Sequence, residues 1–449
     1  MFILFTNGCN QMENNNFTGE TNEVKLITLA PGHFHAYLVQ KDMYDQVDPT
    51  VHVYAPPGPE VERHLAMIED YNSRDNDPTS WNQVVYVGDD YLERMLSEKK
   101  GNVVVLAGNN RLKTSYIKQA VDNGLNVLSD KPMVINSANF ELLKDAFDSA
   151  EENNVLLYDI MTERFEITSI LQKEFMQLPA VFGQLTRGTP EEPAVVKESV
   201  HYLFKYVSGR VLQRPPWYFD VTQQGEGIVD VTTHLVDLIQ WACFHGEIID
   251  YQNDIEMLSA RRWPTSLTLD QFESITRVPE FPSYLDQYID DDGILHVYCN
   301  GEMNYTLFGH HARVIVKWDF QAPEGTGDTH YSITRGTNVN LIIEQGVEQN
   351  FKPVLYIEPV GNIADFDQVL TREFAKIQAK YPGVELKKLN DRWEVVVPPV
   401  YDVGHEAHFA QVTENYLQYL IDGRLPDWEI PNMIAKYYTN TKALEMAKE

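Results

Sequence analysis

The feature that most constrains this chain is a regular alternation of short apolar runs and amphipathic stretches between residues 24 and 158. Helical periodicity fills most of the gaps between the apolar runs. Strands that are apolar on both faces and alternate with helices indicate a parallel sheet covered on both sides. In such a doubly wound sheet the ligand crevice lies at the carboxyl ends of the strands. The predicted strands are 24–29, 51–54, 84–86, 102–107, 126–128 and 155–158.

After residue 164 the pattern changes. Helices are predicted at 167–175, 228–243 and 363–381 and from about residue 405. Several of the predicted strands alternate apolar and polar residues, as in an antiparallel sheet with one solvated face. We therefore predict an α/β Rossmann domain over residues 24–163 and an α+β domain with a large, mostly antiparallel sheet over 164–449. The strands predicted for this second domain are 181–187, 294–299, 302–307, 313–320, 330–335, 340–345, 354–357 and 393–397.

Composition excludes some classes of partner. The chain has 449 residues, with 66 Asp and Glu against 36 Lys and Arg, for a formal net charge of −30. So negative a surface is repelled by phosphate backbones and anionic lipid headgroups, which argues against binding nucleic acid or a membrane surface through charge. No apolar run approaches the length of a transmembrane helix.

The first 23 residues resemble a leader rather than part of a domain. Cys9 follows a small residue and precedes a polar stretch, which resembles the end of a bacterial lipoprotein signal. Only eight residues precede it, without a basic segment, so the signal is incomplete. Two interpretations stay open: a lipid-anchored periplasmic protein, or a cytoplasmic protein with a frayed end. Cys243 and Cys299 lie in apolar contexts and are expected to be buried free thiols.

The turn after the first strand is a weak dinucleotide fingerprint. Such a fingerprint uses glycine for a tight turn and for approach to the pyrophosphate. Only Gly32 matches cleanly, while Ala30 and His35 occupy the other two positions. The second strand ends without the acidic residue that usually binds the ribose, and Glu60 comes several residues too late. The sequence therefore does not distinguish NAD from NADP.

Five motifs then follow in order: 102–110, 120–133 (AVDNGLNVLSDKPM), Arg164–Phe165, 225–237 (GEGIVDVTTHLVD) and 332–337. Together they resemble the glucose–fructose oxidoreductase/inositol dehydrogenase (Gfo/Idh/MocA) family. The chain departs from the family pattern at three positions. Asp130 replaces a Glu, Asn109 replaces a Pro, and Lys113 stands where a His is usual.

The resemblance implies a two-domain oxidoreductase that uses NAD or NADP, acts on a carbohydrate and forms a homo-oligomer. It implies Lys131 as the catalytic lysine, His234 as the proton acceptor and Asp230 as the partner of His234. The residues expected to bind the cofactor are Ala30, Gly32, His33, Phe34, His35, Asn109, Asn110, Asp130 and Pro132.

Elementary chemistry agrees with these roles. On a helix Asp230 and His234 would share one face, and a carboxylate beside an imidazole makes a general base. Spacing alone favours an ordinary helix pair, because i, i+4 pairs are common on helices. The ordered motifs reverse this preference and favour catalysis. Lys131, at a strand end beside a proline, would project into the crevice and stabilise a developing alkoxide.

A second group of residues is expected to border the substrate: Glu163, Arg164, His201, Lys205 and Trp217. His405 and His408 form an HxxH pair, but no third ligand accompanies them, so no metal is expected.

Three functions compete. The first is reversible hydride transfer between NAD(P) and a secondary alcohol of a sugar or polyol. The second is an NAD-dependent glycosidase that passes through a transient keto-sugar and keeps its cofactor. The third is a non-catalytic sugar-binding lipoprotein.

Overall fold

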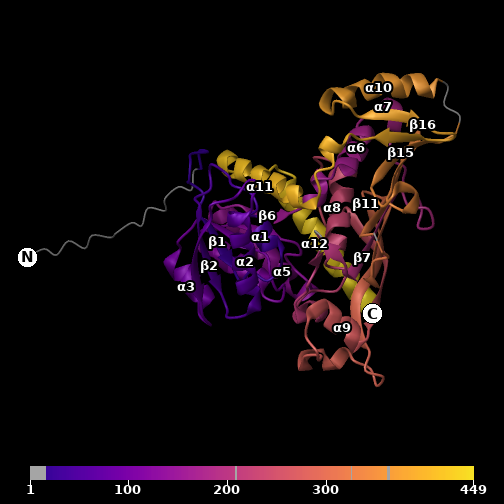
Figure 1. Cartoon of the computed structure of the whole chain (residues 1–449). Helices are drawn as coiled ribbons and strands as arrows, with labels where there is room; N and C mark the ends of the chain where they lie inside the picture. The colour runs from indigo at the N-terminus through magenta and orange to yellow at the C-terminus, as the bar shows by residue number, and fades with distance from the viewer. Residues whose placement is uncertain (1–16, 208–209, 325, 362–364) are drawn as a thin grey trace, which may run out of the picture.

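The computed structural model describes residues 17–207, 210–324, 326–361 and 365–449, so the expectation for Cys9 falls outside the described residues. Figure 1 shows two sheets side by side, with the last helix running between them. Within the described part of the chain, no helix is both long and apolar enough to cross a membrane.

The first sheet is the predicted Rossmann sheet. Its six strands are parallel in the order β3-β2-β1-β4-β5-β6, which is the doubly wound arrangement. The strands are β1 (Leu26–Leu29), β2 (Thr50–Ala55), β3 (Asn82–Val87), β4 (Val103–Leu106), β5 (Asn126–Asp130) and β6 (Leu157–Ile160). The helices are α1 (His35–Leu38), α2 (Pro59–Ser73), α3 (Tyr91–Glu98), α4 (Lys113–Asp122) and α5 (Phe140–Glu152). The sequence did not predict α2, because only four of its residues are buried and its apolar stripe is thin.

The second sheet has nine strands in the order β10-β11-β12-β7-β13-β14-β15-β17-β16. Every neighbouring pair is antiparallel except β7 and β12, which confirms the mostly antiparallel sheet. The strands are β7 (Val195–Phe204), β10 (Ile255–Leu267), β11 (Leu295–Leu307), β12 (His310–Gln321), β13 (Thr329–Arg335), β14 (Val339–Glu344), β15 (Val354–Pro359), β16 (Glu385–Lys388) and β17 (Trp393–Val396). The helices before the C-terminal pair are α6 (Ile167–Met176), α7 (Pro179–Phe182), α8 (Thr232–Cys243), α9 (Leu269–Thr276) and α10 (Phe366–Lys380), and a two-stranded hairpin joins β8 (Tyr206–Val207) to β9 (Arg210–Val211).

Two strand predictions in this domain were wrong in detail. The strand predicted at 181–187 begins instead as the short helix α7, which Pro179 starts and Gly183 ends with a φ of +76°. The segments predicted as two strands at 294–299 and 302–307 form the single strand β11. The ladder continues through Gly301, where a Cβ would lie 2.7 Å from Ile228.

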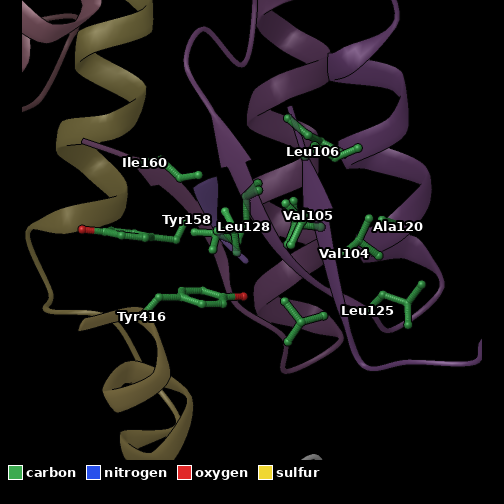
Figure 2. Packing of buried hydrophobic residues seen from close by; sticks show 14 of the residues in the cluster. Val104, Val105, Leu106, Ala120, Leu125, Leu128, Tyr158, Ile160 and Tyr416 are labelled. Atoms are coloured by element: carbon green, nitrogen blue, oxygen red, sulfur yellow. The ribbon is translucent and has the colours of Figure 1, made fainter. Parts of the chain in front are cut away.

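The last two helices return to the Rossmann sheet. They are α11 (His405–Asp422) and α12 (Glu429–Lys448). Tyr416 of α11 stacks on Tyr158 of β6, with ring centroids 6.0 Å apart and an interplanar angle of 11° (Figure 2). The apolar core of the Rossmann domain therefore includes residues from the far end of the chain. Cys299 is buried as expected, whereas Cys243 is half-buried; both are free thiols.

A cluster of buried charges lies where the two sheets meet. Arg164 donates two hydrogen bonds of 2.7 Å to the Asp237 carboxylate and one of 2.7 Å to Glu429. Lys436 of α12 donates to Asp237 at 2.8 Å and pairs with Asp159 of β6 at 2.7 Å. We expected Arg164 to border the substrate, but its guanidinium is committed to these ion pairs. The cluster therefore joins β6, α8 and α12.

Removing one partner from this cluster should destabilise the fold. Lys436 and Asp159 are fully buried, so Lys436→Ala leaves a carboxylate without its cation. Breaking a buried pair in this way costs about 3–5 kcal/mol. Urea denaturation measures the loss. Lys442→Ala, which removes an exposed lysine of the same helix, is the matched control and should change the free energy of unfolding by about 0.5 kcal/mol or less. Equal effects of the two substitutions would contradict the structural role of the cluster.

Candidate active site

Lys131 stands at the end of β5 and is held by Asp230. Its Nζ donates to Asp230 Oδ1 at 2.5 Å, and Asp230 Oδ2 accepts a 3.1 Å hydrogen bond from Gln224. The two side chains are 11% and 7% exposed. Burial would raise the pKa of the Asp230 carboxyl, but the Lys131 ammonium outweighs it and the pKa falls below its usual value. The ion pair is therefore formed, and it joins the end of β5 to the turn before α8.

This pairing differs from the expected one between Asp230 and His234. Helix α8 begins at Thr232 with Val231 as its N-cap, so Asp230 lies in the preceding turn and the helical i, i+4 relation does not apply. The carboxylate turns to Lys131 instead. His234, in the first turn of α8, is half-buried, and its Nδ1 lacks a hydrogen-bond partner among the described residues. Burial and the nearby Lys131 charge lower the pKa of His234 well below its usual value, so the imidazole is neutral near pH 7.

Two of the three departures from the family motifs, Asp130 and Lys113, meet in one buried cluster, whereas Asn109 donates to Gln223. The Lys113 ammonium binds Asp130 Oδ1, and Nδ1 atoms of His33 and His35 lie 3.2 Å from Oδ2. Asp130 is 2% exposed, and although burial alone would raise its pKa, Lys113 holds that pKa well below the usual value. A metal ion could span the donors of His33, His35 and Asp130, which lie within 4.8 Å, but the carboxylate already binds Lys113. The cluster fixes the first turn of the Rossmann domain onto β5.

A chamber of about 330 Å³ opens at the carboxyl ends of β1, β2 and β4. Ala30, Gly32 and Asn109 line it, as expected for cofactor-binding residues, and Trp217 and Glu60 line it as well. Gly108 allows the two loops at this edge to meet, because a Cβ there would lie 2.3 Å from the Ala30 carbonyl oxygen. The position and size suit the adenosine half of a dinucleotide. His33 and Phe34 line an adjoining hollow, and Pro132 follows Lys131 through a cis peptide bond.

Residues 217–224 of the second domain, here called the strap, lie across this chamber. Trp217 Nε1 donates to Glu60 Oε1 at 3.1 Å, and Asn109 Nδ2 donates to Gln223 Oε1 at 2.7 Å. Asn110 Nδ2 donates to the Gln224 carbonyl oxygen at 2.7 Å, and Arg111 donates to Thr222 at 2.8 Å. Trp217, expected beside the substrate, lines this chamber together with Ala30 and Gly32. Asn110, expected to bind cofactor, anchors the strap.

The other candidates for substrate contact lie on the large sheet and beside β6. Asp328 Oδ2 accepts from Lys205 Nζ at 2.5 Å and lies 2.9 Å from His201 Nδ1. Burial raises the pKa of Glu163 to about 7, and its neighbours include Lys131 and Asp328. The charges of Lys131 and Asp328 therefore both act on Glu163. Sequence reasoning missed Asp328, which precedes β13 in a glycine-containing loop that carries no motif.

Comparisons with known proteins agree with this architecture. Residues 43–159 match the model of the oxidoreductase family with an NAD-binding Rossmann fold (GFO_IDH_MocA), and residues 171–448 match the model described as "Putative oxidoreductase C terminal domain". A crystal structure described as a "putative oxidoreductase" from Parabacteroides merdae is 55% identical. It has a TM-score of 0.95, and the match covers 96% of this chain and 99% of that one. The chain therefore belongs to the Gfo/Idh/MocA oxidoreductases and is an NAD(P)-dependent enzyme.

More distant structures share the fold. Levoglucosan dehydrogenase, in complex with NADH and levoglucosan, has a TM-score of 0.59 at 13% identity, over 94% of this chain and 97% of that one. A 3-ketoreductase from Actinomadura kijaniata, in complex with NADP and TDP-benzene, has a TM-score of 0.55 at 12% identity, over 92% and 95%. Among the curated proteins, none matches the chain.

The charge of Lys131 should be measurable at His234. Because that charge contributes to the low pKa of the imidazole, Lys131→Met should raise the pKa of His234 towards its usual value. NMR titration of the histidine Cε1–H resonances, assigned with His234→Gln, measures the shift. Lys442→Met, which removes an exposed lysine from α12, is the control and should leave the titration unchanged. A His234 titration that is the same in wild type and Lys131→Met would show that the two groups do not face each other.

Proposed function

We propose that the chain transfers hydride reversibly between NAD(P) and a secondary alcohol of a sugar or polyol. The observation that supports this proposal is the electrostatic contact of Lys131 with His234, which come from the two domains, together with a chamber at the carboxyl ends of the Rossmann strands. The titles of two structural neighbours, a levoglucosan dehydrogenase and a 3-ketoreductase, support a carbohydrate substrate. The non-catalytic alternative is set aside because the family consists of oxidoreductases.

The bound nicotinamide would supply or accept the hydride, and the residues of the chain handle the proton and the charge. Lys131 donates a hydrogen bond to the substrate oxygen and stabilises the negative charge that develops there as the carbon loses hydride. Asp230 holds the ammonium in position by its 2.5 Å contact. His234, neutral because of burial and the Lys131 charge, accepts the hydroxyl proton. In the reverse direction the same groups return the proton to the carbonyl oxygen.

The far wall of the substrate site is assigned to the large sheet. Lys205 and His201 converge on Asp328, so this wall offers charged donors and acceptors around one carboxylate. Such a group suits the closely spaced hydroxyls of a sugar. Burial raises the pKa of Glu163 to about 7, and the charges of Lys131 and Asp328 both act on it, so we assign Glu163 to the same site.

The role of Lys131 is tested by substitution. Lys131→Met should lower kcat at least about 100-fold, because it removes the donor to the developing alkoxide. Affinity for NADH should change little. NADH absorbance during turnover of a panel of anhydrosugars, aldoses and polyols measures the first effect, and fluorescence titration the second. Turnover at the wild-type rate would refute the assignment of the catalytic lysine.

A second candidate function is favoured by the strap. Its hydrogen bonds to Glu60, Asn109, Asn110 and Arg111 join the two domains beside the chamber, so they would help to retain a bound dinucleotide. A cofactor held in this way suits an NAD-dependent glycosidase that oxidises the sugar transiently, eliminates the glycosidic substituent and regenerates the cofactor within each turnover.

Incubation with aryl glycosides, without added cofactor, distinguishes the two functions. Many equivalents of released phenol per enzyme would support the glycosidase. Product limited to the amount of bound cofactor would leave the dehydrogenase as the function.

The lipid anchor at Cys9 and the homo-oligomer remain predictions from the sequence. If the anchor exists, a retained cofactor becomes necessary, because free NAD is not available outside the cytoplasm.

A further inference from the structure

An acidic side chain, that of Glu60, lines the chamber at the ends of β1, β2 and β4, although Glu60 does not stand at the end of the second strand. Rossmann sites that bind NAD usually carry an acidic residue at the end of the second strand, where it binds the ribose hydroxyls. Here β2 ends at Ala55 and is followed by Pro56 and Pro57, which offer no charge. The chain then enters α2 at Pro59, so Glu60 lies in the first helical turn and lines the chamber. A residue several positions beyond the strand thereby reaches the same space.

Glu60 is also held in place there. Trp217 of the strap donates its indole N–H to Glu60 Oε1 at 3.1 Å, and the second carboxylate oxygen lies beside Gly58. A Cβ at Gly58 would come within 3.0 Å of that oxygen, so the glycine leaves it room. The hydrogen bond from the other domain fixes the carboxylate and leaves one oxygen for a ligand.

The other charges nearby do not favour an additional phosphate. Of the residues that line the chamber, Arg111 is the one cation, and it donates to Thr222 and lies 3.6 Å from the Asp220 carboxylate. Asp220 is 1% exposed, so this anion is a fixed part of the site. Arg63 lines the adjoining hollow rather than the chamber, whereas Glu60 lines both and Trp217 lines the chamber.

From these observations we propose that Glu60 makes the enzyme selective for NAD over NADP. The inference rests on the proposed function, since it assigns the chamber to the adenosine half of the dinucleotide. The Glu60 carboxylate accepts hydrogen bonds from the ribose hydroxyls of NAD. The 2′-phosphate of NADP would bring a dianion against that carboxylate, with the one cation of the chamber already engaged by Asp220.

Binding rather than turnover tests this assignment. Purified protein is stripped of co-purified nucleotide with charcoal and titrated separately with NADH and NADPH, following nucleotide fluorescence. We expect NADH to bind at least about tenfold more tightly, because like charges brought together at a binding site are strongly unfavourable. Glu60→Gln, which keeps the shape and removes the charge, should bring the two affinities to within about threefold. Glu62→Gln is the matched control, because Glu62 is an exposed acidic residue in the same helical turn and lines neither cavity.

Each result has a distinct meaning. Equal affinities in the wild type, or a preference for NADPH, would overturn the assignment and indicate that Arg63 or Arg111 binds the phosphate. A preference for NADH that survives Glu60→Gln would overturn the role of Glu60 alone. Failure to bind either nucleotide would contradict the proposed function together with this inference. Glu60→Arg provides a second variant, which should favour NADPH.

Discussion

The site depends on the buried charges that join the two domains. Asp237 of α8 accepts hydrogen bonds from both Arg164 and Lys436, while Lys436 also pairs with Asp159 of β6. Such a cluster gains little stability over an apolar core, but it tolerates few geometries, because every buried charge needs its partner. Helix α8 carries His234 one turn before Asp237, and Arg164 directly follows Glu163. The position of His234 relative to the Rossmann sheet is thus set by these buried ion pairs.

Charge at the crevice is arranged in pairs. Lys131 binds Asp230, Lys113 binds Asp130, and Lys205 binds Asp328. Each of these cations is balanced locally inside a molecule whose formal charge is −30. Two of the three departures from the family motifs belong to one such pair, since Lys113 and the shorter Asp130 bind each other with His33 and His35 at the edge.

Much of the Rossmann domain could be predicted because its strands are buried on both faces and read as apolar runs. Helix α2 could not, since its mostly polar surface hides the periodicity, and with it the location of Glu60 was missed. The position of Lys131 at a strand end could be predicted from its motif. The partner of Asp230 could not be predicted, because the spacing of residues along the sequence does not show that α8 begins two residues after Asp230. Long-range contacts such as Lys205 with Asp328 and Trp217 with Glu60 have no signature within either segment.

A crystal structure of the full chain with NADH bound would locate the redox site. We expect the adenosine in the chamber beside Trp217 and the nicotinamide between Lys131 and His234. A dinucleotide bound elsewhere, or a nicotinamide turned away from Lys131, would contradict the assignment of this crevice as the redox site.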